Sequence, residues 1–272
     1  MKQARKNIKG LGPALFMFIL IVGGLISFVK YYNLDWRNLL DMTFYENLAN
    51  PSVRIVKVEE GMRKEQIADL MGQKLGWNEE KKDEFVNAHL ALDKEDQEGR
   101  YFPKTYMVLK NEEPLAVSVS MFNEFSKQTA KIKKPKATKI LNEDTVLKIA
   151  SIIQREAADK NDMKLISGII WNRVFKGMKL QIDATLQYAK GDEENGWWGP
   201  VRPQDKYIES PYNTYKHTEL PPTPIANPGL AAIEAAYNPQ KTSCIFYMHD
   251  KKHNIHCSAT YDGHLANIKR YY

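Results

Sequence analysis

Residues 142–158, NEDTVLKIASIIQREAA, decide the fold because they predict a capped helix with one buried face. Asn142 and the two acidic residues after it supply an N-cap and an acidic first turn for a helix over about 145–158. The apolar residues that share one face of this helix are Val146, Ile149, Ala150, Ile153 and Ala157. A stripe of this kind predicts a helix that packs into the core.

Glu156 continues this apolar face, because it follows Ile153 by three residues and Ile149 by seven. Desolvation there would disfavour the charged carboxylate and raise its pKa, as a general acid working near neutral pH requires. The alternative is a structural glutamate paired with Arg155, Lys160 or Arg173. Periodicity alone leaves both interpretations open.

The elements around this helix predict an α+β fold. Upstream, the pattern predicts a strand over 53–58, helices over 64–75 and 79–90, a return strand over 107–109 and a helix over about 115–129. Downstream, it predicts a helix over 162–176 ended by Gly177, a helix after Gly229, strands around 245–248 and 255–260, and a last helix containing His264.

The N-terminal segment predicts a single membrane span. Leu11–Val29 contains no charged residue and would form a helix about 28 Å long, close to the thickness of a bilayer core. Basic residues precede it without acidic ones, so the positive-inside rule places the N-terminus in the cytoplasm. A cleaved signal peptide is the competing interpretation. The length of the run and the lack of a small-x-small site before Lys30 argue against it.

Charge and cysteine content limit the classes of function. The chain has 39 basic and 33 acidic residues, and without the four basic residues ahead of Leu11 the excess is about +2, so nucleic-acid binding gains no support. Cys244 and Cys257 form either a disulfide or two free thiols. The histidines lack the spacing of a ligand set, so we expect no metal and no other cofactor.

Three polar segments in the second half could contact a ligand. Over 177–185, polar and apolar residues alternate, which suits either one hydrogen-bonding edge or an amphipathic strand. Trp197 and Trp198 would either stack on sugar rings or anchor their loop. The segment 210–229 contains five prolines and is therefore stiff, and stiff loops with polar side chains hold ligands well.

Taken in order, these segments resemble the endolytic murein transglycosylases, the MltG-like (YceG) family. The resemblance covers nearly the whole chain. Upstream, residues 98–106 are similar to the family's Gly-x-x-Phe-Pro-x-Thr-Tyr segment. The other segments that carry the resemblance are residues 150–157, Trp171-Asn172-Arg173, 177–185, 210–215, 220–229 and the His264 helix.

The resemblance implies an enzyme that cuts nascent peptidoglycan between N-acetylmuramic acid and N-acetylglucosamine. Glu156 would protonate the leaving oxygen and then help the muramic C6 hydroxyl to close a 1,6-anhydro ring, without the second carboxylate of ordinary glycosidases. Gln154 stands where the family commonly has an acidic residue. The residues implied to line the glycan groove are Gln181, Asp183, Thr185, Asn213, Thr214, Tyr215 and Asn227.

The resemblance also implies a domain order: a cytoplasmic tail and transmembrane helix over 1–30, a stalk over 31–50, a LysM-like subdomain over 51–110 and a mixed α/β catalytic domain over 111–272. The expected location is the bacterial inner membrane, with the catalytic domain on the extracytoplasmic side. The expected partners are peptidoglycan strands, the bilayer through Leu11–Val29 and cell-wall synthases. The alternatives are a hydrolytic muramidase and a non-catalytic, glycan-binding scaffold of the elongation machinery.

Overall fold

A computed structural model describes residues 2–32, 34, 41–135, 141–194 and 196–272, and the side chains of these residues from 15 onward. The chain divides into two compact units. One contains residues 1–57 and 104–111, and the other contains residues 58–103 and 112–272.

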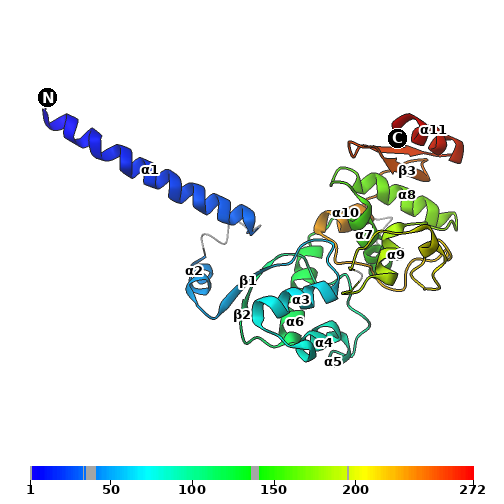
Figure 1. The fold of residues 1–272 in the computed structure, drawn as a ribbon, viewed down its shortest axis with the longest axis horizontal. Coiled ribbons are helices and arrows are strands. Elements are labelled where there is room, and N and C mark those ends of the chain that lie inside the picture. The colour runs from blue at the N-terminus through cyan, green and yellow to red at the C-terminus, as the bar shows by residue number, and fades with distance from the viewer. Residues whose placement is uncertain (1, 33, 35–40, 136–140, 195) are drawn as a thin grey trace. The chain divides into compact units, whose positions relative to one another are not determined.

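The first unit contains two helices and one small sheet (Figure 1). The helices are α1 (Lys2–Tyr31) and α2 (Met42–Ala49), and the strands are β1 (Val53–Lys57) and β2 (Thr105–Leu109). The strands pair antiparallel, with Ile55 opposite Met107. Both predicted strands are confirmed.

Helix α1 covers the predicted membrane span, and its large apolar side chains from Leu15 to Ile21 are exposed. In the part of the chain that the structure describes, no helix combines the length and the apolar character that a membrane crossing needs. The predicted span begins at Leu11, among residues whose side chains lie outside the described set. The predicted stalk contains α2, capped by Asp41, whereas residues 33 and 35–40 are not described.

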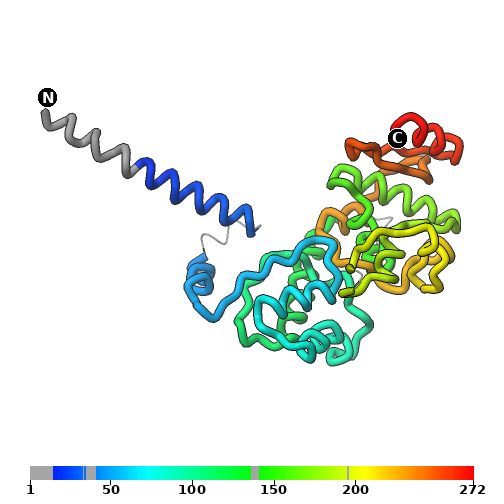
Figure 2. The backbone as a smooth tube through the Cα atoms, viewed as in Figure 1, coloured from blue at the N-terminus to red at the C-terminus, as the bar shows by residue number. Residues whose placement is uncertain are grey.

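The second unit is mostly helical, as the backbone in Figure 2 shows. Its elements are α3 (Lys64–Leu75), α4 (Glu79–Val86), α5 (Ala88–Ala91), α6 (Pro114–Thr129), α7 (Glu143–Glu156), α8 (Met163–Phe175), α9 (Asp183–Lys190), a 3-10 helix (Pro203–Tyr207), α10 (Leu230–Tyr237), β3 (Phe246–His249), β4 (Ile255–Ser258) and α11 (Tyr261–Tyr271).

Most predicted elements of this unit are confirmed, with three differences. The helix predicted over 79–90 is two short helices joined at Asn87. The strand alternative for 177–185 is wrong, because α9 begins at Asp183. The predicted LysM-like subdomain is divided, since its strands belong to the first unit and its helices to the second. Its LysM-like character stays a prediction.

Helix α7 lies at the centre of the second unit's core. Helices α8, α9 and α10 all pack against it. As a result, Leu147 and Ile152, which lie outside the predicted stripe, are buried together with the stripe itself. The helix is therefore enclosed on more sides than its periodicity predicts, up to the turn that ends in Glu156.

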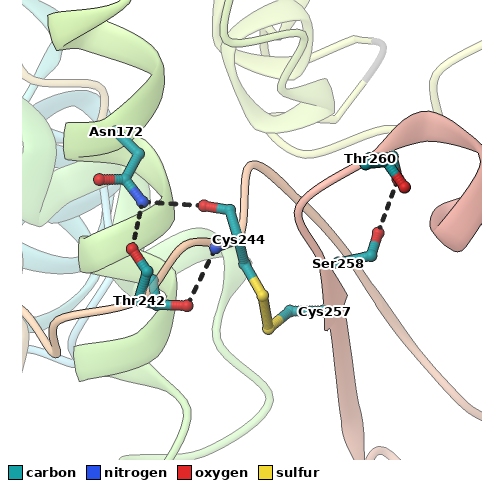
Figure 3. Close-up of a disulfide and its surroundings, with 6 residues drawn as sticks. All are labelled: Asn172, Thr242, Cys244, Cys257, Ser258 and Thr260. Carbon is teal, nitrogen blue, oxygen red and sulfur yellow. Dashed lines mark hydrogen bonds between the residues drawn. A yellow bond between two sulfur atoms is a disulfide. The ribbon is translucent and has the colours of Figure 1, made fainter.

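The C-terminal hairpin is held against α8 by close contacts and hydrogen bonds, and a disulfide closes the hairpin itself. A Cβ on Gly168 would collide with the carbonyl oxygen of Gln240, so glycine allows segment 239–245 to lie against α8. Figure 3 shows Asn172 Nδ2 donating to the carbonyl oxygens of Thr242 and Cys244, at 2.9 Å each. A disulfide joins Cys244 to Cys257, with Cα atoms 5.8 Å apart, which resolves the alternative left open by the sequence.

The disulfide should stabilise the hairpin mainly by restricting the unfolded chain. For a sequence separation of 13 residues, the loop-entropy relation gives about 3 kcal/mol. We expect the double variant Cys244→Ser, Cys257→Ser to lose about that much free energy of unfolding in denaturant titrations. A reductant should lower the stability of the parent protein and leave the variant unchanged. Equal stability of parent and variant would contradict this account.

Candidate active site

A cavity of about 350 Å³ opens at the C-terminal end of α7. Four residues predicted from the sequence line it: Glu156, Gln181, Asp183 and Tyr215. The other lining residues are Arg173, Leu180, Phe246, Tyr247, Tyr261 and His264. Helices α7, α8, α9 and α11, strand β3 and the loop before the proline-rich segment therefore meet at one place.

Glu156 is the last residue of α7, and its carboxyl group is buried at a cavity lined by aromatic and polar side chains. Burial raises the pKa of Glu156, and the neighbouring Asp183 raises it further. Three contacts lower the pKa: the hydrogen bond from Tyr247, the nearby His249 and the backbone N–H of Ala184. Burial outweighs them, so the pKa of Glu156 lies above its ordinary value. The predicted desolvation of this carboxyl group is confirmed.

The hydrogen-bond partner of Glu156 is a tyrosine rather than a cation. Tyr247 Oη donates to Glu156 Oε2 at 2.6 Å. Within the described residues, no ion pair joins Glu156 to Arg155, Lys160 or Arg173, which the structural alternative required. Tyr247 therefore fixes the orientation of the carboxyl group that Glu156 contributes to the cavity.

Tyr247 is a candidate site residue that sequence reasoning missed. Burial and the adjacent Glu156 raise the pKa of Tyr247 well above its ordinary value, so its hydroxyl stays protonated and able to donate. It lies 91 positions after Glu156 in the chain. The only sequence signal is its place in a predicted aromatic strand, which does not indicate the helix that the strand approaches.

A second tyrosine–carboxylate pair faces the same cavity. Tyr215 Oη donates to Asp183 Oδ1 at 2.6 Å, and Asp183 is the first residue of α9. Just before it, Gln181 has a φ of 54°, a left-handed conformation that costs energy for a residue with a side chain. Thr214 holds this backbone, because its carbonyl oxygen accepts from Gln181 N and its hydroxyl from Ile182 N, each at 3.0 Å.

Four predicted groove residues do not line the cavity: Thr185, Asn213, Thr214 and Asn227 are buried and hydrogen-bonded inside the protein. The Thr185 hydroxyl bonds to Ile182 O and to the Thr214 hydroxyl. Asn213 Nδ2 donates to the carbonyl oxygens of Lys206 and Ile208. The prediction that the side chains of these four residues line the groove is therefore corrected. Thr185, Asn213 and Thr214 hold the backbone that presents Gln181, Asp183 and Tyr215.

Asn227 makes the most extensive of these internal contacts. Its Nδ2 donates to Glu98 Oε1 at 2.6 Å and to Met62 O at 3.1 Å, while its Oδ1 accepts from Tyr101 N at 2.8 Å. Burial raises the pKa of Glu98 to about 8. Asn227 therefore joins the proline-rich loop, the 98–103 loop and the segment before α3.

Arg173 lies on the cavity wall and is fixed by three backbone carbonyl groups. It donates to Ile245 O and Leu180 O at 2.6 Å each, and to Lys179 O at 3.3 Å. Its guanidinium therefore ties α8 to the segment before β3 and to the segment before α9. Burial and the charge of Arg173 lower the pKa of His264, which favours a neutral imidazole at this wall.

Two other histidines pair with carboxylates instead of gathering into a metal site. His249 contacts Asp162 at 2.9 Å and His256 contacts Asp250 at 3.0 Å. Among the residues that the structure describes, no three or more His, Cys, Asp or Glu side chains form a group that could hold a metal ion.

The two tryptophans serve as loop anchors, the alternative to sugar stacking. The guanidinium of Arg155 lies 3.8 Å from the centre of the Trp198 ring, and Trp198 Nε1 donates to Gln66 at 2.9 Å. The guanidinium of Arg63 likewise lies 4.8 Å from the centre of the Trp197 ring. The loop is thereby held against α3 and α7.

Gln154, which stands where the family commonly has an acidic residue, supports the proline-rich loop. Its Oε1 accepts from Gly229 N at 3.0 Å, and one turn earlier Ser151 Oγ accepts from Ile225 N at 3.0 Å. The residues of α7 next to Glu156 therefore position backbone and do not supply a second carboxylate.

A single buried carboxylic acid in an open polar cavity is the arrangement of a general acid–base enzyme. The model of the YceG-like family matches residues 32–270, and the chain belongs to this family. The endolytic murein transglycosylase of Bacillus subtilis (strain 168) is 32% identical to it over 175 residues, which are 64% of this chain and 48% of that protein. That of Streptococcus pneumoniae (strain D39) is 30% identical over 173 residues, 63% of this chain and 31% of that protein.

The chain spans about half the length of the Bacillus subtilis relative and about a third of the Streptococcus pneumoniae one. The crystal structure of a YceG-like protein from Listeria monocytogenes matches with a TM-score of 0.69 and 24% identity, over 88% of each chain. This structure has the same fold.

The hydrogen bond from Tyr247 lowers the pKa of Glu156, so its removal should raise that pKa further. We expect Tyr247→Phe to shift the titration of Glu156 to higher pH, as followed by NMR of ¹³C-labelled glutamate carboxyl groups. Tyr207→Phe, at an exposed tyrosine, is the matched control and should leave the titration unchanged. An unchanged or lowered pKa in the Tyr247 variant would show that this bond does not act on Glu156.

Asn227→Ala should destabilise the protein, because it leaves the buried carboxyl group of Glu98 without its amide partner. We expect a loss of about 3 kcal/mol in free energy of unfolding. Asn161→Ala, at an exposed asparagine, should change stability by less than about 0.5 kcal/mol. Full stability together with weakened glycan binding in the Asn227 variant would instead assign this side chain to the groove.

Proposed function

We propose that this chain is a lytic transglycosylase that cuts peptidoglycan glycan strands internally, between N-acetylmuramic acid and N-acetylglucosamine. The observation that carries the proposal is the desolvated Glu156 carboxyl group, which lines the cavity and accepts a hydrogen bond from the protonated Tyr247. Two relatives named endolytic murein transglycosylase support the substrate class.

In the proposed reaction, Glu156 first acts as a general acid. Its raised pKa favours the protonated form, and the proton passes to the glycosidic oxygen as the bond from C1 to this oxygen breaks. The carboxylate that remains is stabilised by Tyr247 and by the backbone N–H of Ala184 at the start of α9.

Glu156 then acts as a general base. It accepts the proton of the muramic C6 hydroxyl while this oxygen forms the new bond to C1, which closes the 1,6-anhydro ring. The proton of the C6 hydroxyl thus replaces the one that Glu156 gave to the leaving oxygen, so the enzyme is restored and the reaction needs neither water nor a second acid. Gln181, Asp183 and Tyr215 face the same cavity and are proposed to bind the sugars on either side of the bond.

A hydrolytic muramidase is the second candidate, because Asp183 places another carboxylate in the cavity. Glycosidases with two carboxylates use the second one as a base or a nucleophile. Here Asp183 Oδ1 accepts a short bond from Tyr215, which favours a fixed, substrate-orienting role. We propose the lyase reaction for this reason.

We also propose that the N-terminal helix anchors the enzyme in the bacterial inner membrane, with the catalytic unit on the extracytoplasmic side. The uncharged run from Leu11 and the basic residues before it support this proposal, as do the exposed apolar side chains of α1. Cell-wall synthases are the proposed partners, because nascent strands would be the substrate.

Glu156→Gln should lower cleavage of isolated glycan strands by about a thousandfold, because the glutamine cannot donate a proton to the leaving oxygen. Mass spectrometry of the products separates the candidates: the parent protein should leave anhydromuramic ends, whereas a hydrolase leaves reducing ends and a scaffold leaves strands intact. Asp183→Asn should weaken cleavage and still give anhydromuramic ends. Full activity of Glu156→Gln would disprove the assignment of the acid.

A further inference from the structure

The end of the C-terminal hairpin and helix carries basic and apolar side chains that are exposed. Helix α11 buries no residue completely. Leu265, Ile268 and Tyr272 expose 45%, 39% and 74% of their surface, and their spacing places them on one face of the helix. We call these three residues, together with Lys251, Lys252, Lys269 and Arg270, the C-terminal tip.

The two parts of the tip are held together by a short chain of contacts. Asp250 Oδ2 bonds to His256 Nε2 at 3.0 Å, and the His256 ring stacks on Tyr271 with ring centres 3.6 Å apart. The turn between β3 and β4 therefore lies beside the last turn of α11, and Figure 1 shows α11 packed along this hairpin. Lys251 and Lys252 on the turn and Lys269 and Arg270 on the helix thus gather at one end.

The charge of the tip is net positive, because its four basic side chains outnumber the carboxylate of Asp250, whose hydrogen bonds lower its pKa and keep it charged. Its four basic side chains are exposed, and within the described residues none of them forms an ion pair. Asp250 is occupied by His256 and by the backbone amides of Lys252 and Asn254. The other carboxylate nearby, Asp262, lies in the first turn of α11, about 10 Å along the axis from Lys269.

From this arrangement we infer that the C-terminal tip docks on the surface of a bilayer that contains anionic lipids. Exposed lysine and arginine side chains bind anionic headgroups, while leucine, isoleucine and a terminal tyrosine enter the interfacial layer. A protein groove would have to match both the apolar face and four unpaired cations, whereas an anionic membrane surface supplies both without a specific shape.

The contact would have a consequence for the cavity. Tyr261 and His264, near the start of α11, are two of the residues that line the cavity next to Glu156. Docking of the last turn would therefore hold the rim of the cavity close to the membrane surface. The inference goes beyond the proposed reaction and does not depend on it.

Hydrogen exchange of the full chain tests the inference, with vesicles of phosphatidylcholine alone or mixed with phosphatidylglycerol. We expect the backbone amides of residues 261–272 to exchange several-fold more slowly with the mixed vesicles than with phosphatidylcholine alone. Each basic side chain should contribute about a fivefold increase in affinity. The variant K251Q/K252Q/K269Q/R270Q should lose the slowing, and L265S/I268S should weaken it.

The matched control is K127Q/K131Q/K133Q/K134Q, which removes the same charge from exposed lysines around the end of α6 and should keep the slowing. All three variants should keep the circular dichroism spectrum and the melting temperature of the parent protein, which shows that they fold. Equal exchange with both vesicles, or loss of slowing in the control variant, would overturn the inference. Slowing that depends on protein concentration without vesicles would identify a second copy as the partner and overturn it as well.

Discussion

Glu156 ends a helix that is enclosed by the core, and its carboxyl group meets a tyrosine instead of a cation. This desolvation is the constraint on which the rest of the site depends. A guanidinium in contact with the carboxylate would favour the charged form and lower the pKa. The arginines nearby are directed elsewhere: Arg155 stacks on Trp198 and Arg173 donates to backbone carbonyl groups. The surroundings of Glu156 therefore raise the pKa of its carboxyl group and favour the neutral form.

The two sides of the cavity reach α7 from distant parts of the chain, and each is fixed by buried polar contacts. On one side, Thr214 holds the strained backbone at Gln181 and the start of α9. On the other, Asn172 and the Cys244–Cys257 disulfide hold the hairpin that carries Tyr247. These contacts fix the backbone of both walls, so the side chains facing the cavity are placed before a ligand arrives, which is the main structural requirement of acid–base catalysis.

Local patterns in the sequence were sufficient for α7 and for the desolvation of Glu156, because an apolar stripe and a carboxylate on the same face are both local features. They could not identify Tyr247, since its contact with Glu156 joins residues 91 positions apart. They also could not separate polar residues that face the cavity from those that face the interior. Asp183 and Thr185 alternate in the sequence, yet the start of α9 turns Asp183 outward and buries Thr185. The interior roles of Asn213, Thr214 and Asn227 depend on tertiary contacts in the same way.

The most direct test of the central claim, that the cavity at the end of α7 is where a glycan strand is cut, is a crystal structure of Glu156→Gln with a short peptidoglycan glycan. The substitution keeps the shape of the site and removes the proton needed for cleavage. We predict a glycosidic oxygen within hydrogen-bond distance of the residue 156 side chain, with sugars on both sides contacting Asp183 and Tyr215. A glycan bound elsewhere on the surface, with this cavity empty, would contradict the account.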